Sequence, residues 1–192
     1  MDKTDIRRQA LIFIKARNNL LAVIVFTVVN LILNAFDAGL NFLFSATIPQ
    51  FIFEIGRSLD AEVENGVFVV VGLISAFIII ITYFVFWFFA KRIRVFILAA
   101  LIFFGIDSLV LLFLIISMEF SFSFLLEIAF HGWILYYLIN GVKAWAKMRG
   151  VSAEVFNAVL NEIKFNNFGP AELAVPAETN NEITEDENST DK

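Results

Sequence analysis

The sequence contains no cysteine, only three prolines and few charged residues. The absence of cysteine excludes a disulfide framework, a thiolate metal site and a cysteine nucleophile. The charged fraction is 17%, against about 25% in soluble domains, and the hydrophobic fraction is 59%, against about 45–50%. The 192 residues therefore offer too little polar surface to cover a water-soluble globule.

Several chemical signatures are also missing. The formal net charge of −5 gives no general attraction to nucleic acid, so we expect no nucleic-acid partner. The sequence has no GxxxxGK[ST] phosphate loop and no GxGxxG dinucleotide motif. It also has no GxSxG nucleophile elbow and no HExxH zinc motif. With one histidine in the chain, a bis-histidine haem within one subunit is excluded.

Four long apolar segments dominate what is present. They cover about residues 19–36, 67–90, 95–117 and 120–142. A bilayer core about 30 Å thick is crossed by roughly 20 helical residues, and these segments lack the polar face of a helix in a soluble bundle. The sequence therefore predicts an all-α integral membrane four-helix bundle within residues 19–150.

The distribution of lysine and arginine predicts the orientation. The segment before the first span, the connection between the second and third spans and the segment after the fourth are basic. The two other connections contain a single cation, Arg57, among several acidic residues. Because basic segments stay in the cytoplasm, we expect a multi-pass protein of the cell (cytoplasmic) membrane with both termini cytoplasmic. No small-residue cleavage site follows the first apolar run, so we expect that helix to remain as an anchor.

The segments outside the spans have their own patterns. Residues 1–18 predict a basic cytoplasmic helix that runs into the first span or lies along the inner surface. Residues 48–59 have one apolar face and predict an interfacial helix over the outer mouth of the bundle, with a re-entrant segment as the alternative. Residues 151–168 predict a cytoplasmic amphipathic helix, and residues 169–192 an acidic disordered tail.

Three ionisable side chains lie inside the predicted spans: Asp107, Glu127 and His131. Counted at 1.5 Å per residue, Asp107 and His131 lie roughly 16–18 Å from the inner boundary, and Asn30 reaches about the same depth. Glu127 and His131 are spaced i,i+4 and share one face. Ionisable groups at this depth are costly and mark candidate sites, so we predict a central polar cluster of these four residues.

The first span has further polar residues on the side of Asn30, namely Thr27 and Asn34. Together with the central cluster they make up the candidate ion, proton or polar binding set. Carboxyl and imidazole groups near the midplane suit a proton relay or ion-coupled transport. The same carboxylates and imidazole are also possible divalent metal ligands, as in an intramembrane metal-dependent hydrolase. The third alternative is a hydrogen-bond network that only fixes helix register.

The best functional hypothesis is a small ion- or proton-coupled transport or channel component. The sequence therefore favours a protein that is not an enzyme. Four helices enclose little volume, so we expect a homo-oligomer or a partner membrane subunit in the lipid bilayer. We expect no organic cofactor, and a divalent metal only in the hydrolase alternative. The remaining alternative is a non-catalytic accessory or regulatory protein that acts through partner binding.

Three runs carry a resemblance to a known group of proteins. They are Lys15-Ala-Arg-Asn-Asn-Leu-Leu21, Phe26-Thr-Val-Val-Asn30 and Asn41-Phe-Leu-Phe-Ser-Ala-Thr-Ile-Pro49. In these runs the chain resembles an uncharacterised family of small four-span membrane proteins of low-GC Gram-positive bacteria. The resemblance covers roughly the first third of the chain. It implies location and topology, and it transfers no catalytic residue.

Overall fold

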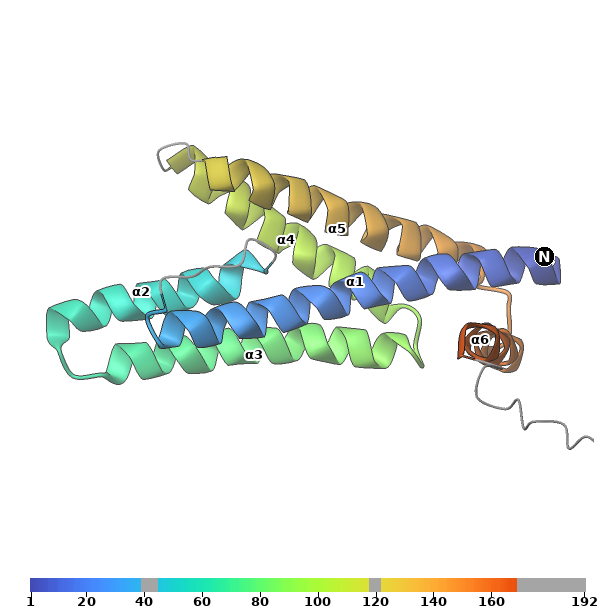
Figure 1. Cartoon of the computed structure of the whole chain (residues 1–192), viewed down its shortest axis with the longest axis horizontal. Coiled ribbons are helices and arrows are strands. Elements are labelled where there is room, and N and C mark those ends of the chain that lie inside the picture. The colour runs from blue at the N-terminus through green and yellow to red at the C-terminus, as the bar shows by residue number, and fades with distance from the viewer. Residues whose placement is uncertain (39–44, 118–121, 169–192) are drawn as a thin grey trace, which may run out of the picture.

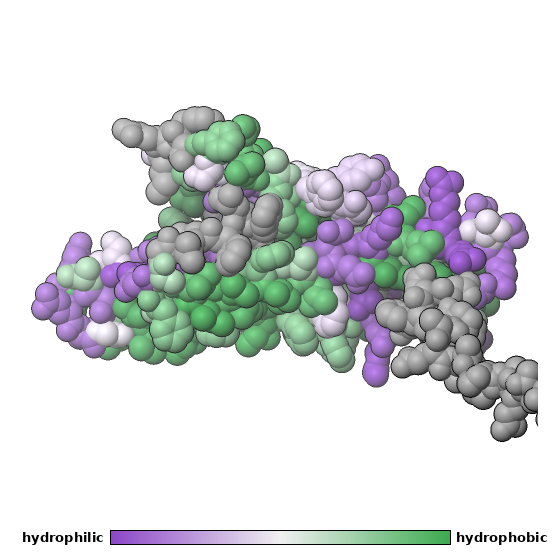
Figure 2. All heavy atoms as spheres, viewed as in Figure 1, coloured by the Kyte–Doolittle hydropathy of each residue, from purple (hydrophilic) through white to green (hydrophobic). Residues whose placement is uncertain are grey.

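The computed structural model describes residues 1–38, 45–117 and 122–168. The described residues form six helices: α1 (Lys3–Ala35), α2 (Thr47–Val63), α3 (Val67–Ala90), α4 (Phe96–Ser117), α5 (Phe122–Lys147) and α6 (Ala153–Phe168). Four of them, α1, α3, α4 and α5, are long and apolar enough to cross a membrane. Figure 2 shows hydrophobic side chains over the middle of one face, between hydrophilic ends. The all-helical prediction with four candidate spans is confirmed, which suggests a multi-pass membrane protein.

Helix α1 is continuous through residue 18, so the N-terminal helix runs straight into the first candidate span, which is one of the two predicted alternatives. Nothing in Lys3–Ala35 breaks a helix, since the segment has no proline or glycine, and Asp2 caps its first turn by accepting from the backbone N–H of Lys3 at 2.7 Å. At 1.5 Å per residue such a helix is about 50 Å long, well beyond a bilayer core of about 30 Å. Its first part therefore extends past the other spans, as Figure 1 shows.

Helices α1 and α5 pack closely against each other. Gly141 of α5 makes this possible: a Cβ atom there would lie 2.5 Å from Cβ of Ala16 and 3.4 Å from Cγ1 of Ile97. Ala16 and Leu20 are fully buried. Small residues thus bring the backbones of two candidate spans together, as in other membrane helix pairs.

Helix α2 covers the predicted amphipathic segment, residues 48–59. It packs along α3, and its first turn contacts the middle of α4 (Figure 1). Gly56 and Gly72 set this packing, since a Cβ on Gly56 would lie 2.6 Å from the carbonyl oxygen of Phe68 and 3.1 Å from Cα of Gly72. The helix over the outer mouth and the re-entrant segment both stay predictions for α2. Residues 39–44, which precede it, lie outside the described residues.

Helix α6 packs on the extended end of α1. Phe156, Val159 and Ile163 are buried, as the predicted apolar stripe required, while Val155 of that stripe is 47% exposed. The rings of Phe13 and Phe156 meet edge to face with centroids 6.1 Å apart. The predicted acidic tail, residues 169–192, lies outside the described residues.

Candidate functional site

The start of α2 is a helix N-terminus inside the bundle, and other helices satisfy all of its free backbone donors. The first residues of a helix have N–H groups without intrahelical acceptors. Here the N–H of Thr47 donates to Oδ2 of Asp107 at 2.9 Å, and that of Ile48 donates to Oδ1 at 2.8 Å. The N–H of Ala46 donates to Oγ1 of Thr27 at 2.9 Å. The next residue, Pro49, has no N–H, so no donor is left unpaired in this turn.

Asp107 therefore caps a helix that lies about sixty positions away in the sequence, in place of a local cap. The N-cap residue of α2, Ala46, has no side chain that can accept a hydrogen bond. A carboxylate at a helix N-terminus also interacts favourably with the helix dipole. Asp107 is fully buried in the middle of α4, and its cost of burial is offset by these donors.

His131 of α5 completes the site from the other side. Its Nε2 lies 3.1 Å from Oδ2 of Asp107 and 3.4 Å from Oγ1 of Thr47. Its Nδ1 lies 3.0 Å from the backbone carbonyl oxygen of Glu127. The ring stacks on Phe104, with centroids 5.0 Å apart and planes 13° from parallel, and only 4% of the residue is exposed. The ring is thus fixed in position and orientation.

These contacts constrain which ring nitrogens of His131 donate a hydrogen bond. Nδ1 faces a carbonyl oxygen, which only accepts, so Nδ1 carries a hydrogen and donates. Nε2 faces a carboxylate oxygen at 3.1 Å, and two lone pairs at that distance would repel. Nε2 and Oδ2 are thus at hydrogen-bond distance, and a proton on either atom can be shared between them, in an imidazolium–carboxylate pair or in a neutral ring that accepts from a carboxylic acid. We call Asp107 and His131 the proton pair.

Helix α1 holds the residues just before α2. Oγ1 of Thr27 accepts from Ala46 and donates to the carbonyl of Val23 at 2.7 Å. Nδ2 of Asn30 donates to Oγ of Ser45 at 2.9 Å. Thr27 and Asn30 are both buried. Of the predicted cluster Asp107, Glu127, His131 and Asn30, the side chains of Asp107 and His131 contact each other. Asn30 contacts Ser45, just before α2, instead.

Asn34 belongs to a second polar group nearer the end of α1. Its Nδ2 donates to Oε1 of Glu54, and its backbone carbonyl accepts from Nη1 of Arg57 at 3.1 Å. Nη2 of Arg57 also pairs with Asp37 at 2.5 Å. This group ties the second half of α2 to α1. Asn34 is therefore separate from the proton pair.

Glu127 was predicted to join this cluster, but its carboxylate does not contact the proton pair. Its backbone carbonyl contacts Nδ1 of His131, and its carboxylate lies within electrostatic range of that ring without a hydrogen bond or ion pair to it among the described residues. No group of three or more histidine, aspartate or glutamate side chains in the described ranges is close enough to hold a metal ion.

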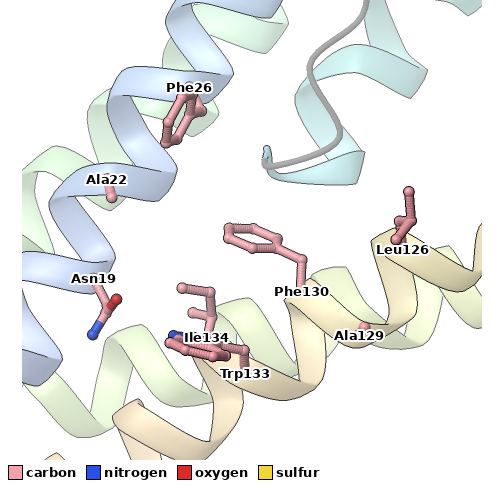
Figure 3. Close-up of a pocket in the computed structure, with 8 residues that line it drawn as sticks. All are labelled: Asn19, Ala22, Phe26, Leu126, Ala129, Phe130, Trp133 and Ile134. Carbon is pink, nitrogen blue, oxygen red and sulfur yellow. The ribbon is translucent and has the colours of Figure 1, made fainter. Parts of the chain in front are cut away.

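The cavities beside the proton pair are apolar. A groove of about 500 Å³ lies between α1 and α5, and Figure 3 shows its lining: Asn19, Ala22, Phe26, Leu126, Ala129, Phe130, Trp133 and Ile134. A smaller cavity of about 150 Å³ touches His131 and is otherwise lined by aliphatic residues, Ser108 and Gly132. Neither cavity gives the proton pair a polar path among the described residues.

Sequence reasoning missed the donors of the site, because they are backbone groups of Thr47 and Ile48. One signal was available. An aspartate inside an apolar span needs donors, and no lysine or arginine lies within the second, third or fourth predicted span. The start of another helix is the remaining common source of two adjacent N–H groups.

Tyr83 of α3 was also missed. Its ring packs on Phe104, and Tyr83 as a whole is 1% exposed. Its hydroxyl has no hydrogen-bond partner in the described part of the chain. It lies within electrostatic range of Asp107.

No protein-family model, curated protein or solved structure matches this chain.

Proposed function

We propose that this protein is a small proton-responsive transport or channel component of a bacterial cell membrane, with both termini cytoplasmic. One observation carries the proposal: a carboxyl group at hydrogen-bond distance from the ring of His131 also holds the start of a partial helix inside the bundle. Helices that begin within the membrane, with their N-termini at the functional site, are a recurrent feature of transporters. The basic segments at the ends of the spans support the orientation.

In this proposal, proton transfer changes how α2 is held. With the carboxylate ionised, both oxygens of Asp107 accept from the first turn of α2. A proton placed on Oδ2 removes the negative charge and makes that oxygen a weaker acceptor for the N–H of Thr47, which weakens the cap. The ionisable neighbours that bear on this step are Glu127, one turn away on α5, and the buried Tyr83 of α3. Loosening of α2 would then open the outer half of the bundle.

The test is proton flux into liposomes that contain the purified protein, followed with an internal pH dye. We expect flux above that of empty liposomes, at least a tenfold loss in Asp107→Asn and in His131→Gln, and retention in Glu127→Gln, whose carboxylate lies outside the pair. Absence of flux from the wild-type protein, or equal flux in all variants, would overturn the proposal.

A spectroscopic measurement checks the proton pair separately from transport. His131 is the only histidine in the chain, so its ring nitrogens give one unambiguous set of nitrogen NMR signals. We expect both nitrogens to be hydrogen-bonded in the wild-type protein and the Nε2 signal to move in Asp107→Asn. An Nε2 signal typical of a free, unprotonated nitrogen would contradict the pair.

A second candidate function is a non-catalytic accessory protein that acts through a partner, or through a second copy of itself, in the membrane. The closure of the site favours it, because Asp107 is 0% exposed and His131 is 4% exposed. In that case the wild-type protein would show no proton flux, and Asp107→Asn would only destabilise the fold. A stoichiometric partner that is lost when residues 170–192 are removed would support this function.

A further inference from the structure

A basic cavity lies where α3 turns into α4, beside α6. Its volume is about 370 Å³. Its lining comprises Lys91, Arg92 and Arg94 from the turn and Ala153, Phe156 and Asn157 from α6. This end of the bundle is remote from the start of α2, so the cavity is separate from the proton pair (Figure 1).

No described side chain neutralises the positive charge of this cavity. In the described part of the chain, no carboxylate lies within ion-pair distance of these three cations. Arg94 donates instead to neutral carbonyl oxygens, from Nη1 to Met148 at 3.2 Å and from Nη2 to Val151 at 2.8 Å. Three unpaired cations around one cavity repel each other, and an anion bound among them would relieve that repulsion.

Arg94 is also held rigidly at the cavity wall. Its guanidinium lies 4.8 Å from the ring centroid of Phe156, on α6, in a cation–π contact. The same side chain therefore joins the α3–α4 turn to α6 and keeps a fixed charge on the lining. Lys91 and Arg92 are exposed and make no side-chain hydrogen bond to the described residues, so both remain able to contact a ligand.

Exposed apolar residues surround the cations. Phe88 and Phe89 at the end of α3 are 49% and 38% exposed, and Ile93 and Val95 within the turn are 50% and 43% exposed. Since the turn joins two candidate membrane spans, it lies at the level where acyl chains meet head groups. Apolar side chains next to unpaired cations match a ligand that carries both acyl chains and a negative charge.

We propose that this cavity binds the head-group phosphate of an anionic phospholipid, with Lys91, Arg92 and Arg94 facing the phosphate and the neighbouring apolar residues facing its acyl chains. A soluble phosphate would use only the cations, and it would leave the exposed phenylalanine and branched side chains without a role. Each cation near an anionic head group contributes about 1 kcal/mol, which corresponds to roughly fivefold in affinity.

The test is native mass spectrometry of the full-length protein released from bilayers that contain equal amounts of phosphatidylglycerol and phosphatidylcholine. We expect one phosphatidylglycerol retained per chain and no retained phosphatidylcholine. The double variant Lys91→Gln/Arg92→Gln should lower this retention roughly 25-fold, at fivefold per cation. Both residues are exposed, so the variant should fold, and a wild-type melting temperature would show that it does.

The matched control is Lys143→Gln/Lys147→Gln, which removes the same charge from exposed positions of α5 that do not line the cavity. We expect this control to retain phosphatidylglycerol like the wild type. Equal losses in both double variants would overturn the proposal in favour of a general basic surface. Equal binding of the two lipids, or displacement of the lipid by millimolar inorganic phosphate, would also overturn it.

Discussion

Helices α2 and α6 look alike as sequences and differ in the folded chain. Both are amphipathic, both lie outside the four candidate spans, and both are predicted to lie on a surface. The first turn of α6 is capped by its own chain, since Oγ of Ser152 accepts from the N–H of Val155 at 3.3 Å. The first turn of α2 is capped by Asp107 and Thr27, which belong to α4 and α1.

Where a helix can begin depends on which residues cap its first turn. A helix that carries its own cap needs only water for its remaining donors, so it can begin at a surface. A helix whose cap comes from other helices can begin inside an apolar bundle, where unpaired donors would be costly. The location of α2 is therefore held by Asp107, and that of α6 by packing on α1.

The largest expected effect comes from Asp107→Ala. This change leaves two buried N–H groups and the imidazole without their acceptor, and it should lower the free energy of unfolding by about 3–5 kcal/mol. The measurement is unfolding in a detergent titration, with hydrogen exchange across residues 47–63 as a local readout. If hydrogen exchange rises only in α6, or if the free energy of unfolding falls by less than about 1 kcal/mol, Asp107 does not hold α2.

The next effect tests the packing of α2 on α3. Gly56→Ala places a Cβ 2.6 Å from the carbonyl oxygen of Phe68, so the two helices must separate. We expect a loss of about 1–3 kcal/mol in the free energy of unfolding. Gly105→Ala in α4 is the matched control, because a Cβ there meets nothing within 4 Å. Equal effects of the two variants would contradict close glycine packing.

A smaller effect comes from Thr27→Val, which removes the acceptor of the Ala46 N–H. We expect a loss of about 1–2 kcal/mol, since that buried donor is left unpaired. Thr82→Val is the control, because Thr82 also donates to a carbonyl one turn back, at 2.9 Å, but lies at the bundle surface and accepts from no distant N–H. If both variants lose the same stability, the contact with Ala46 contributes nothing measurable.

The four spans could be predicted because hydropathy is local and accumulates along a segment. The candidate site could be predicted only in part. Depth and helical face brought Asp107 and His131 together correctly, since both depend on residue spacing within one helix. The same reasoning placed the Glu127 carboxylate in the cluster. A side chain one turn away on the same face of a helix need not contact the same partner, however.

The position of α2 could not be predicted from its own residues. Its amphipathic pattern is compatible with a headgroup surface and with a groove on α3. The contacts that decide between them join residues about sixty positions apart, and they use backbone donors that have no sequence signature. Gly56 and Gly72 permit close packing of α2 on α3, but their pairing depends on the register of the two helices.

The smallest expected effect concerns the other helix of the comparison. Ser152→Ala removes the local cap of α6 and should cost about 0.5–1 kcal/mol. Hydrogen exchange should rise only in the first turn of α6, because the edge contact of Phe13 with Phe156 and the hydrogen bonds of Arg94 remain. Ser75→Ala, which removes only a hydroxyl bonded within α3, is the control. Release of the whole of α6 would mean that its position, like that of α2, depends on its cap, and the distinction between the two helices would no longer hold.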